Sequence, residues 1–152
     1  SATVLHLIRT NRPISTQAAR LLAVGNVAYP ASGRSPNTTR ETRGMFDATG
    51  SGITALPSTA DEIAAIAALA GPKSVVLDGR AATEKALKSQ PLRSFSVLHL
   101  AVHGVADSKF PDRSALVFGS DAAAHEDGLL QVREIESLPL NADLVTLSAC
   151  DT

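Results

Sequence analysis

Two apolar runs of the same design stand out in the pattern of hydrophobic and polar positions. One spans residues 96–104 and ends in His103 and Gly104, and the other spans residues 144–152 and contains Cys150. Apolar runs of this length are typical of strands buried on both faces of a parallel sheet. Because α/β sheets bind ligands beyond the carboxyl ends of their strands, neighbouring strands here would bring an imidazole and a thiol into one crevice.

The rest of the chain alternates between strand-like and helix-like segments. This alternation predicts an α/β fold with a mainly parallel sheet and right-handed crossovers. A continuous apolar run over residues 21–28 predicts a central strand. The other predicted strands are residues 74–79 and 115–119, and the predicted helices are residues 1–9, 58–70, 84–88 and 129–136.

Two of these helices have clear start signals. Asp61 and Glu62 lie in the first turn of the helix over residues 58–70, where acidic groups suit the helix dipole. Thr83 is the predicted N-cap of the helix over residues 84–88. The helix over residues 58–70 ends at Gly71-Pro72 and has four apolar residues on one face: Ile63, Ile66, Ala67 and Ala70.

The length of 152 residues predicts a single domain, residues 1–152. Periodicity is lost over residues 31–58, where Ser, Gly, Thr, Pro and Arg predominate, and we predict a mobile surface loop there. Such a loop is either a functional wall or cleavage site, or a variable insertion without a role.

Composition excludes several classes of protein. Hydrophobic residues make up 44% of the chain but aromatic residues only 3%, so the core must be aliphatic. With a net charge of −1 and few aromatics, the chain does not fit a nucleic-acid reader, and we expect no nucleic-acid partner. No apolar stretch approaches the roughly 20 residues of a membrane span, so no membrane partner is expected either.

A single cysteine cannot form an internal disulfide, which favours a reducing, cytoplasmic location. The start of the sequence shows no secretory signal pattern. Charge is uneven: residues 1–45 contain six Arg and only Glu41 as an acid, so the part with His103 and Cys150 is acidic. That part either favours a cationic ligand or is simply a solvated surface.

A thiol and an imidazole at one sheet edge suggest nucleophilic catalysis. A thiolate attacks carbonyl carbon, and His103 could stabilise the thiolate or give a proton to a leaving amine. The backbone N–H groups of Gly104 and Cys150 could form an oxyanion hole. Taken alone, Cys150 is also compatible with a small buried hydrophobic residue, and His103 with a structural one.

The other polar residues point to no bound group. His99 has the same strand parity as His103, but it lies in mid-strand and is predicted to be a core histidine bonded internally. The histidines lack metal-ligand spacing to thiols or carboxylates, so we predict no metal. Neither Gly25-Asn26 nor residues 50–52 form a phosphate-binding glycine motif, so we predict no cofactor.

Four blocks of sequence lie in a fixed order and spacing: residues 97–104, 114–118, 127–130 with 133–135, and 141–152. Together they resemble the CHAT family, a caspase-like cysteine protease family often attached to tetratricopeptide repeats. Weaker similarity upstream extends the resemblance over residues 21–152. The 47 residues from His103 to Cys150 also match the roughly 50-residue spacing of caspase-type enzymes.

The resemblance implies a caspase-haemoglobinase-like, three-layer fold, truncated here at both ends because family members normally continue in both directions. It also implies that Cys150 is the nucleophile, that His103 is the general acid and base, and that the Gly104 backbone lies in the oxyanion hole. Expected partners are a protein or peptide substrate and a tetratricopeptide-repeat region in the parent protein.

The resulting hypothesis is a cysteine endopeptidase that acts through a thioester. Asp107 and Asp151 are weak candidates for specificity, since acidic groups would favour a basic residue before the scissile bond. One alternative is a catalytically silent caspase-like scaffold or interaction module, whose thiol would not react with a peptidyl electrophile. Another is a plain α/β ligand-binding domain with a buried thiol distant from His103.

Overall fold

The computed structural model describes residues 20–29, 53–107, 109–119, 121 and 126–148. The predicted opening helix, residues 31–52 of the predicted loop, and the candidate residues Cys150 and Asp151 lie outside the described residues. Within the described part, no helix has the length and hydropathy needed to cross a membrane.

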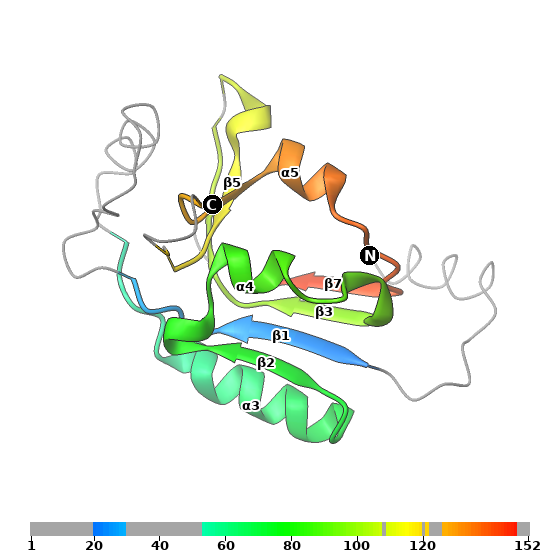
Figure 1. Cartoon of the computed structure of the whole chain (residues 1–152). Coiled ribbons are helices and arrows are strands. Elements are labelled where there is room, and N and C mark those ends of the chain that lie inside the picture. The colour runs from blue at the N-terminus through cyan, green and yellow to red at the C-terminus, as the bar shows by residue number, and fades with distance from the viewer. Residues whose placement is uncertain (1–19, 30–52, 108, 120, 122–125, 149–152) are drawn as a thin grey trace, which may run out of the picture.

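A four-stranded parallel sheet forms the centre of the described fold (Figure 1). Its strand order is β2-β1-β3-β7, with β1 at Leu21–Gly25, β2 at Val75–Asp78, β3 at Val97–Leu100 and β7 at Leu144–Leu147. All five residues of β1 are buried, which confirms the central strand that its continuous apolar run predicted. The prediction of an α/β fold with a mainly parallel sheet is thereby confirmed.

Helices pack on both faces of this sheet (Figure 1). The helix α3, Ser58–Ala70, covers one face, where its buried Ile63 contacts Leu21 and Ala23. On the other face, Leu22 and Val24 belong to the main core. That core also contains Leu87 of α4, the helix Glu84–Lys88. The period-two alternation along β1 thus sends successive side chains to two different layers.

The ends of these helices follow the sequence signals. Gly71 ends α3 with a φ of 88°, a conformation that glycine adopts without strain. At the start of α4, the Thr83 side chain accepts a hydrogen bond from the Ala86 N–H, as predicted. Glu134 accepts the Gln131 N–H at the start of α5, Val132–Ser137. Among the described residues, short 3-10 helices lie at Gly79–Ala81, Leu92–Ser94 and Pro111–Arg113.

The two strands that lead to His103 and Cys150 are neighbours. β3 pairs with β7 in parallel, with Leu100 opposite Leu147. The ladder continues one residue further, since the Ser148 N–H donates to the Leu100 carbonyl at 2.9 Å. The predicted burial of the second strand was wrong: Leu144, Val145 and Leu147 are 48%, 45% and 56% exposed, because β7 is the edge strand of the described sheet.

The predicted strand over residues 96–104 is split into two. β3 ends at Leu100, and β4, His103–Val105, pairs antiparallel with β5, Ala115–Val117. β5 pairs in turn with β6, Leu129–Gln131, to complete a three-stranded antiparallel sheet. Residues 129–131, predicted to begin a helix, therefore form a strand instead. Because His99 and His103 lie on different strands, the prediction that both side chains share one side of a single extended strand was wrong.

The second sheet packs against the main core through one face of β5. Leu116 and Phe118 join the core of the parallel sheet, whereas Ala115 and Val117 form a separate cluster with Leu129. Because Phe95 and Phe118 are both buried in the main core, the prediction of a purely aliphatic core was wrong. The Gly119 N–H donates to the Ala82 carbonyl, which ties the end of β5 to the start of α4. This attachment fixes where β4, and with it His103, lies relative to the parallel sheet.

Gly25 is a position where any side chain would meet its neighbours. A Cβ built there would lie 2.8 Å from Ile63 Cγ2 and 3.2 Å from the Thr59 carbonyl oxygen. We therefore expect Gly25→Ala to lower the free energy of unfolding by about 1–3 kcal/mol, as overpacked cores generally do. Urea unfolding would measure the loss. Adding Ile63→Leu, which removes the Cγ2 branch, should restore part of it; an unchanged midpoint for Gly25→Ala would contradict the close packing.

Candidate functional site

His103 is the first residue of β4 and is half-buried. Its ring Nε2 lies 2.8 Å from the Thr54 carbonyl oxygen. Because a carbonyl oxygen can only accept, Nε2 must carry the hydrogen of this bond. In the neutral ring, Nδ1 is then the nitrogen that can accept a proton. This contact therefore favours the tautomer with the hydrogen on Nε2, which leaves Nδ1 as the acceptor.

Tyr29 contacts His103 in two ways. The two rings lie 5.1 Å apart between centroids with an interplanar angle of 52°, a tilted packing. The Tyr29 hydroxyl oxygen accepts the backbone N–H of His103 at 3.2 Å. The same hydroxyl donates to the Val117 carbonyl at 3.0 Å. Burial raises the pKa of Tyr29 to about 12, despite the opposing hydrogen bond from His103, so the hydroxyl is a neutral group at physiological pH.

The remaining predicted site residues are placed as follows. Gly104 lies in β4 opposite Leu116. Asp107 uses its Oδ1 to accept the N–H groups of Lys109 and Phe110, both at 2.9 Å, so its carboxylate holds the turn after β4. Cys150 and Asp151 lie outside the described residues. The specificity roles of Asp107 and Asp151 stay predictions.

His99 is a core histidine, as predicted. It is 6% exposed in the middle of β3, and its Nε2 lies 2.8 Å from Glu62 Oε1 on α3. This contact joins the helix to the sheet from within the structure. His99 is therefore accounted for by packing and takes no part in the candidate site.

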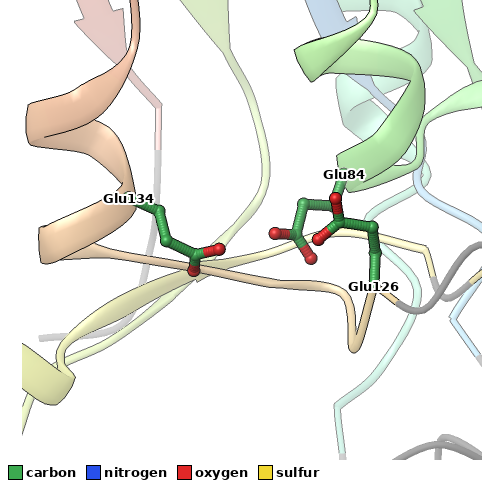
Figure 2. A group of neighbouring side chains, drawn as sticks. All are labelled: Glu84, Glu126 and Glu134. Atoms are coloured by element: carbon green, nitrogen blue, oxygen red, sulfur yellow. The ribbon is translucent and has the colours of Figure 1, made fainter.

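A second group of ionisable residues lies where α4, α5 and the segment before β6 meet (Figure 2). The carboxylates of Glu84, Glu126 and Glu134 offer oxygen atoms within 4.8 Å of one another. Figure 2 shows Glu84 and Glu126 side by side, with Glu134 directed toward them from α5. Lys88 Nζ contacts all three, at 2.6 Å from Glu84, 3.0 Å from Glu126 and 2.8 Å from Glu134. The ammonium group thus takes the position that a bound cation would need.

Burial and neighbouring charges shift the pKa values of two of these carboxylates, Glu84 and Glu134, in opposite directions. Burial raises the pKa of Glu84 to about 7; Lys88 opposes this rise and Glu126 adds to it. Burial also opposes ionisation of Glu134, but hydrogen bonds from Lys88 and the Gln131 backbone outweigh it and lower the pKa of Glu134. Burial disfavours the charged form of Lys88 too, yet the three carboxylates raise the pKa of its ammonium. One ammonium therefore contacts three carboxylates, and burial raises the pKa of the most buried one, Glu84.

Two residues that contact His103 were not predicted from the sequence. Thr54 acts through its backbone, which has no sequence signature, and it lies in the segment read as a loop. Tyr29 did carry a signal: it is the only tyrosine in the chain, and it follows the central strand toward the carboxyl edge of the sheet. An aromatic residue with a hydroxyl at that edge is a natural partner for a site histidine.

The fold and the site together define an α/β protein with a histidine held beyond the carboxyl end of a parallel strand. The family model of the CHAT domain matches residues 1–152, the whole sequence. The chain therefore belongs to the CHAT domain family, which is a caspase-like cysteine protease family. No curated protein matches the chain.

Proposed function

We propose that the chain is a cysteine endopeptidase domain that cleaves protein substrates through Cys150 and His103. The observation that carries the proposal is the pairing of β3 with β7, in which Leu100 lies opposite Leu147. His103 follows Leu100 by three residues, and Cys150 follows Leu147 by three. Ser148 is still bonded to β3, and the two residues from there to Cys150 span at most about 7 Å of chain.

The proposed reaction uses the imidazole as base and then as acid. Nδ1 of His103 accepts the thiol proton, and the Cys150 thiolate attacks the carbonyl carbon of the scissile peptide bond. The imidazolium gives its proton to the leaving amine as the C–N bond breaks, which leaves a thioester on Cys150. Water, deprotonated by the same imidazole, then attacks the thioester, releases the carboxylate product and restores the thiol.

The Thr54 carbonyl supports this role of His103. It accepts the Nε2 hydrogen, so the opposite ring nitrogen is the one available to the thiol. When the ring is protonated, the same carbonyl still accepts from Nε2 and stabilises the positive charge. A main-chain acceptor held by its own segment thus orients the base in both protonation states.

We propose the backbone N–H groups of Gly104 and Cys150 as the oxyanion hole. Gly104 follows the base directly, and its missing side chain leaves room for a substrate oxygen to approach the backbone. Losing one donor of an oxyanion hole typically costs about 10²–10³ in rate.

Further proposals rest on membership of the family. They are a single domain over residues 1–152 with a caspase-haemoglobinase-like, three-layer architecture, a tetratricopeptide-repeat region in the parent protein, and a cytoplasmic location. Packing of α3 and α4 on opposite faces of the parallel sheet supports the architecture.

Thiol labelling separates an enzyme from a catalytically silent scaffold. We expect a peptidyl acyloxymethyl ketone to alkylate Cys150 in the complete protein, and His103→Asn to slow labelling by about 10²-fold or more, the usual size of general acid–base catalysis. Mass spectrometry of peptides would locate and time the label. Arg80→Gln, an exposed change in the 3-10 helix Gly79–Ala81, is the control for loss of a basic side chain. Equal labelling rates for the protein with and without His103 would rule out the dyad and favour the scaffold.

A further inference from the structure

The Tyr29 hydroxyl lies between two strands at the position of the candidate base. His103 and Val117 are partners in the pairing of β4 with β5. The hydroxyl accepts from the His103 N–H at 3.2 Å and donates to the Val117 carbonyl at 3.0 Å. One side-chain group from the end of the central strand thus links both residues of this pair.

Tyr29 also joins two of the hydrophobic clusters. Its ring packs against the main core of the parallel sheet and against the cluster of Ala115, Val117 and Leu129 under the second sheet. The residue is therefore anchored on both sides, and its ring presents a fixed surface to the imidazole at 5.1 Å. A side chain held in this way can set the position of its neighbour.

We propose that Tyr29 is a positioning residue for His103, which it holds in the geometry needed to serve Cys150; this inference rests on the proposed function. Three contacts define the imidazole: the Tyr29 hydroxyl fixes the backbone N–H, the Tyr29 ring packs against the imidazole, and the Thr54 carbonyl fixes Nε2. Tyr29 supplies two of the three. Without its hydroxyl, the N–H of His103 loses this partner and β4 can shift relative to β5.

The role differs from simple packing. Phenylalanine would fill the same volume and keep the ring contact, so packing alone predicts no effect of removing the hydroxyl. Positioning predicts a change in the reactive step, because a displacement of about 1 Å at a catalytic group can cost up to about 10²-fold in rate. The hydroxyl is far from any pH at which it would ionise, so it acts as a hydrogen-bonding group and exchanges no proton with the substrate.

The test is Tyr29→Phe in the complete protein, with the peptidyl acyloxymethyl ketone as probe. We expect the maximal rate of Cys150 alkylation to fall about 10-fold, while the concentration of probe giving half that rate stays within about twofold. Ile63→Val, which trims the α3 side of the core away from His103, serves as the packing control and should leave both constants unchanged. An alkylation rate equal to that of the unsubstituted protein would overturn the proposal.

Nitrogen-15 NMR of the His103 ring gives a readout that does not depend on catalysis. We expect the unsubstituted protein to show the neutral tautomer with the hydrogen on Nε2, and Tyr29→Phe to show a mixture of tautomers. If Cys150 never reacts with the probe but the tautomer shifts as expected, the proposed function fails and the positioning of His103 stands. An unchanged ring spectrum in folded Tyr29→Phe would refute the positioning role, whatever the reactivity of Cys150.

Discussion

Replacing Cys150 by alanine in the complete protein is expected to abolish peptide-bond cleavage. The variant lacks the only thiol of the chain, so no thioester can form. Replacing His103 by alanine should lower the rate by roughly 10³-fold or more, because the thiol loses its proton acceptor and the leaving amine its proton donor. The measurement is cleavage of a positional peptide library and of cognate protein substrates, followed by mass spectrometry.

Arg80→Gln, an exposed change in the 3-10 helix after β2, is the control and should keep full activity. Unchanged processing of a cognate substrate by the Cys150→Ala variant would refute the peptidase assignment.

The sequence predicted the parallel sheet whose neighbouring strands lead toward His103 and Cys150. Continuous apolar runs over residues 21–28 and 96–104 indicated buried parallel strands, and the structure makes β3 the neighbour of both β1 and β7. The hypothesis required adjacency of the His-bearing and Cys-bearing runs, and the pairing of Leu100 with Leu147 meets that requirement.

The break after Leu100 was not predictable from the pattern. Ala101 and Val102 are both fully buried and apolar, so the run continues in hydropathy although the strand does not. What turns the chain is pairing at long range: His103 joins Val117 of β5 and the Tyr29 hydroxyl, which lie 14 residues after it and 74 before it. Local periodicity carries no information about such partners.

The ion-pair cluster of Lys88 with Glu84, Glu126 and Glu134 also depends on long-range partners that the local sequence pattern does not reveal. The sequence places residues 84–88 on a short helix, and the acidic excess of this part of the chain is interpreted as favouring a cationic ligand or as a solvated surface. In the structure, Glu126 and Glu134 reach the Lys88 ammonium from 38 and 46 residues away. The charges of a helix face cannot be assigned to solvent before its tertiary partners are known.

Removing the Lys88 charge is expected to destabilise the protein by about 3 kcal/mol, the scale for breaking a buried ion pair on one side. Lys88→Met keeps the length of the side chain but leaves the carboxylates of Glu84, Glu126 and Glu134 facing one another. Lys85→Met on the same helix is exposed and should change the free energy of unfolding by less than about 0.5 kcal/mol. Urea unfolding of both variants would measure the difference, and equal losses would show that the ammonium does not hold the cluster together.

The pH dependence of this cluster follows from Glu84. Its pKa is raised from 4.5 to about 7 in the fold, so the folded state binds more protons than the unfolded state between these values. The stability that Glu84 contributes is therefore fully present below about pH 4.5 and is lost as the pH rises through 7. The lowered pKa of Glu134 acts in the opposite sense, but only at lower pH, where that carboxylate becomes protonated.

Glu84→Gln isolates this effect because it imitates the protonated carboxyl group. The glutamine oxygen can still accept the Gly128 N–H, which donates to Glu84 Oε2 at 3.0 Å, while the amide adds no negative charge next to Glu126. We expect the variant to be more stable than the unsubstituted protein at pH 8 and to lose less stability between pH 5.5 and pH 8. Titrating groups elsewhere affect both proteins alike, so the difference between their unfolding curves reports Glu84. A gap between the two proteins that does not change with pH would show that Glu84 is already ionised throughout this range, and the single Lys88 ammonium would then have to neutralise all three carboxylates.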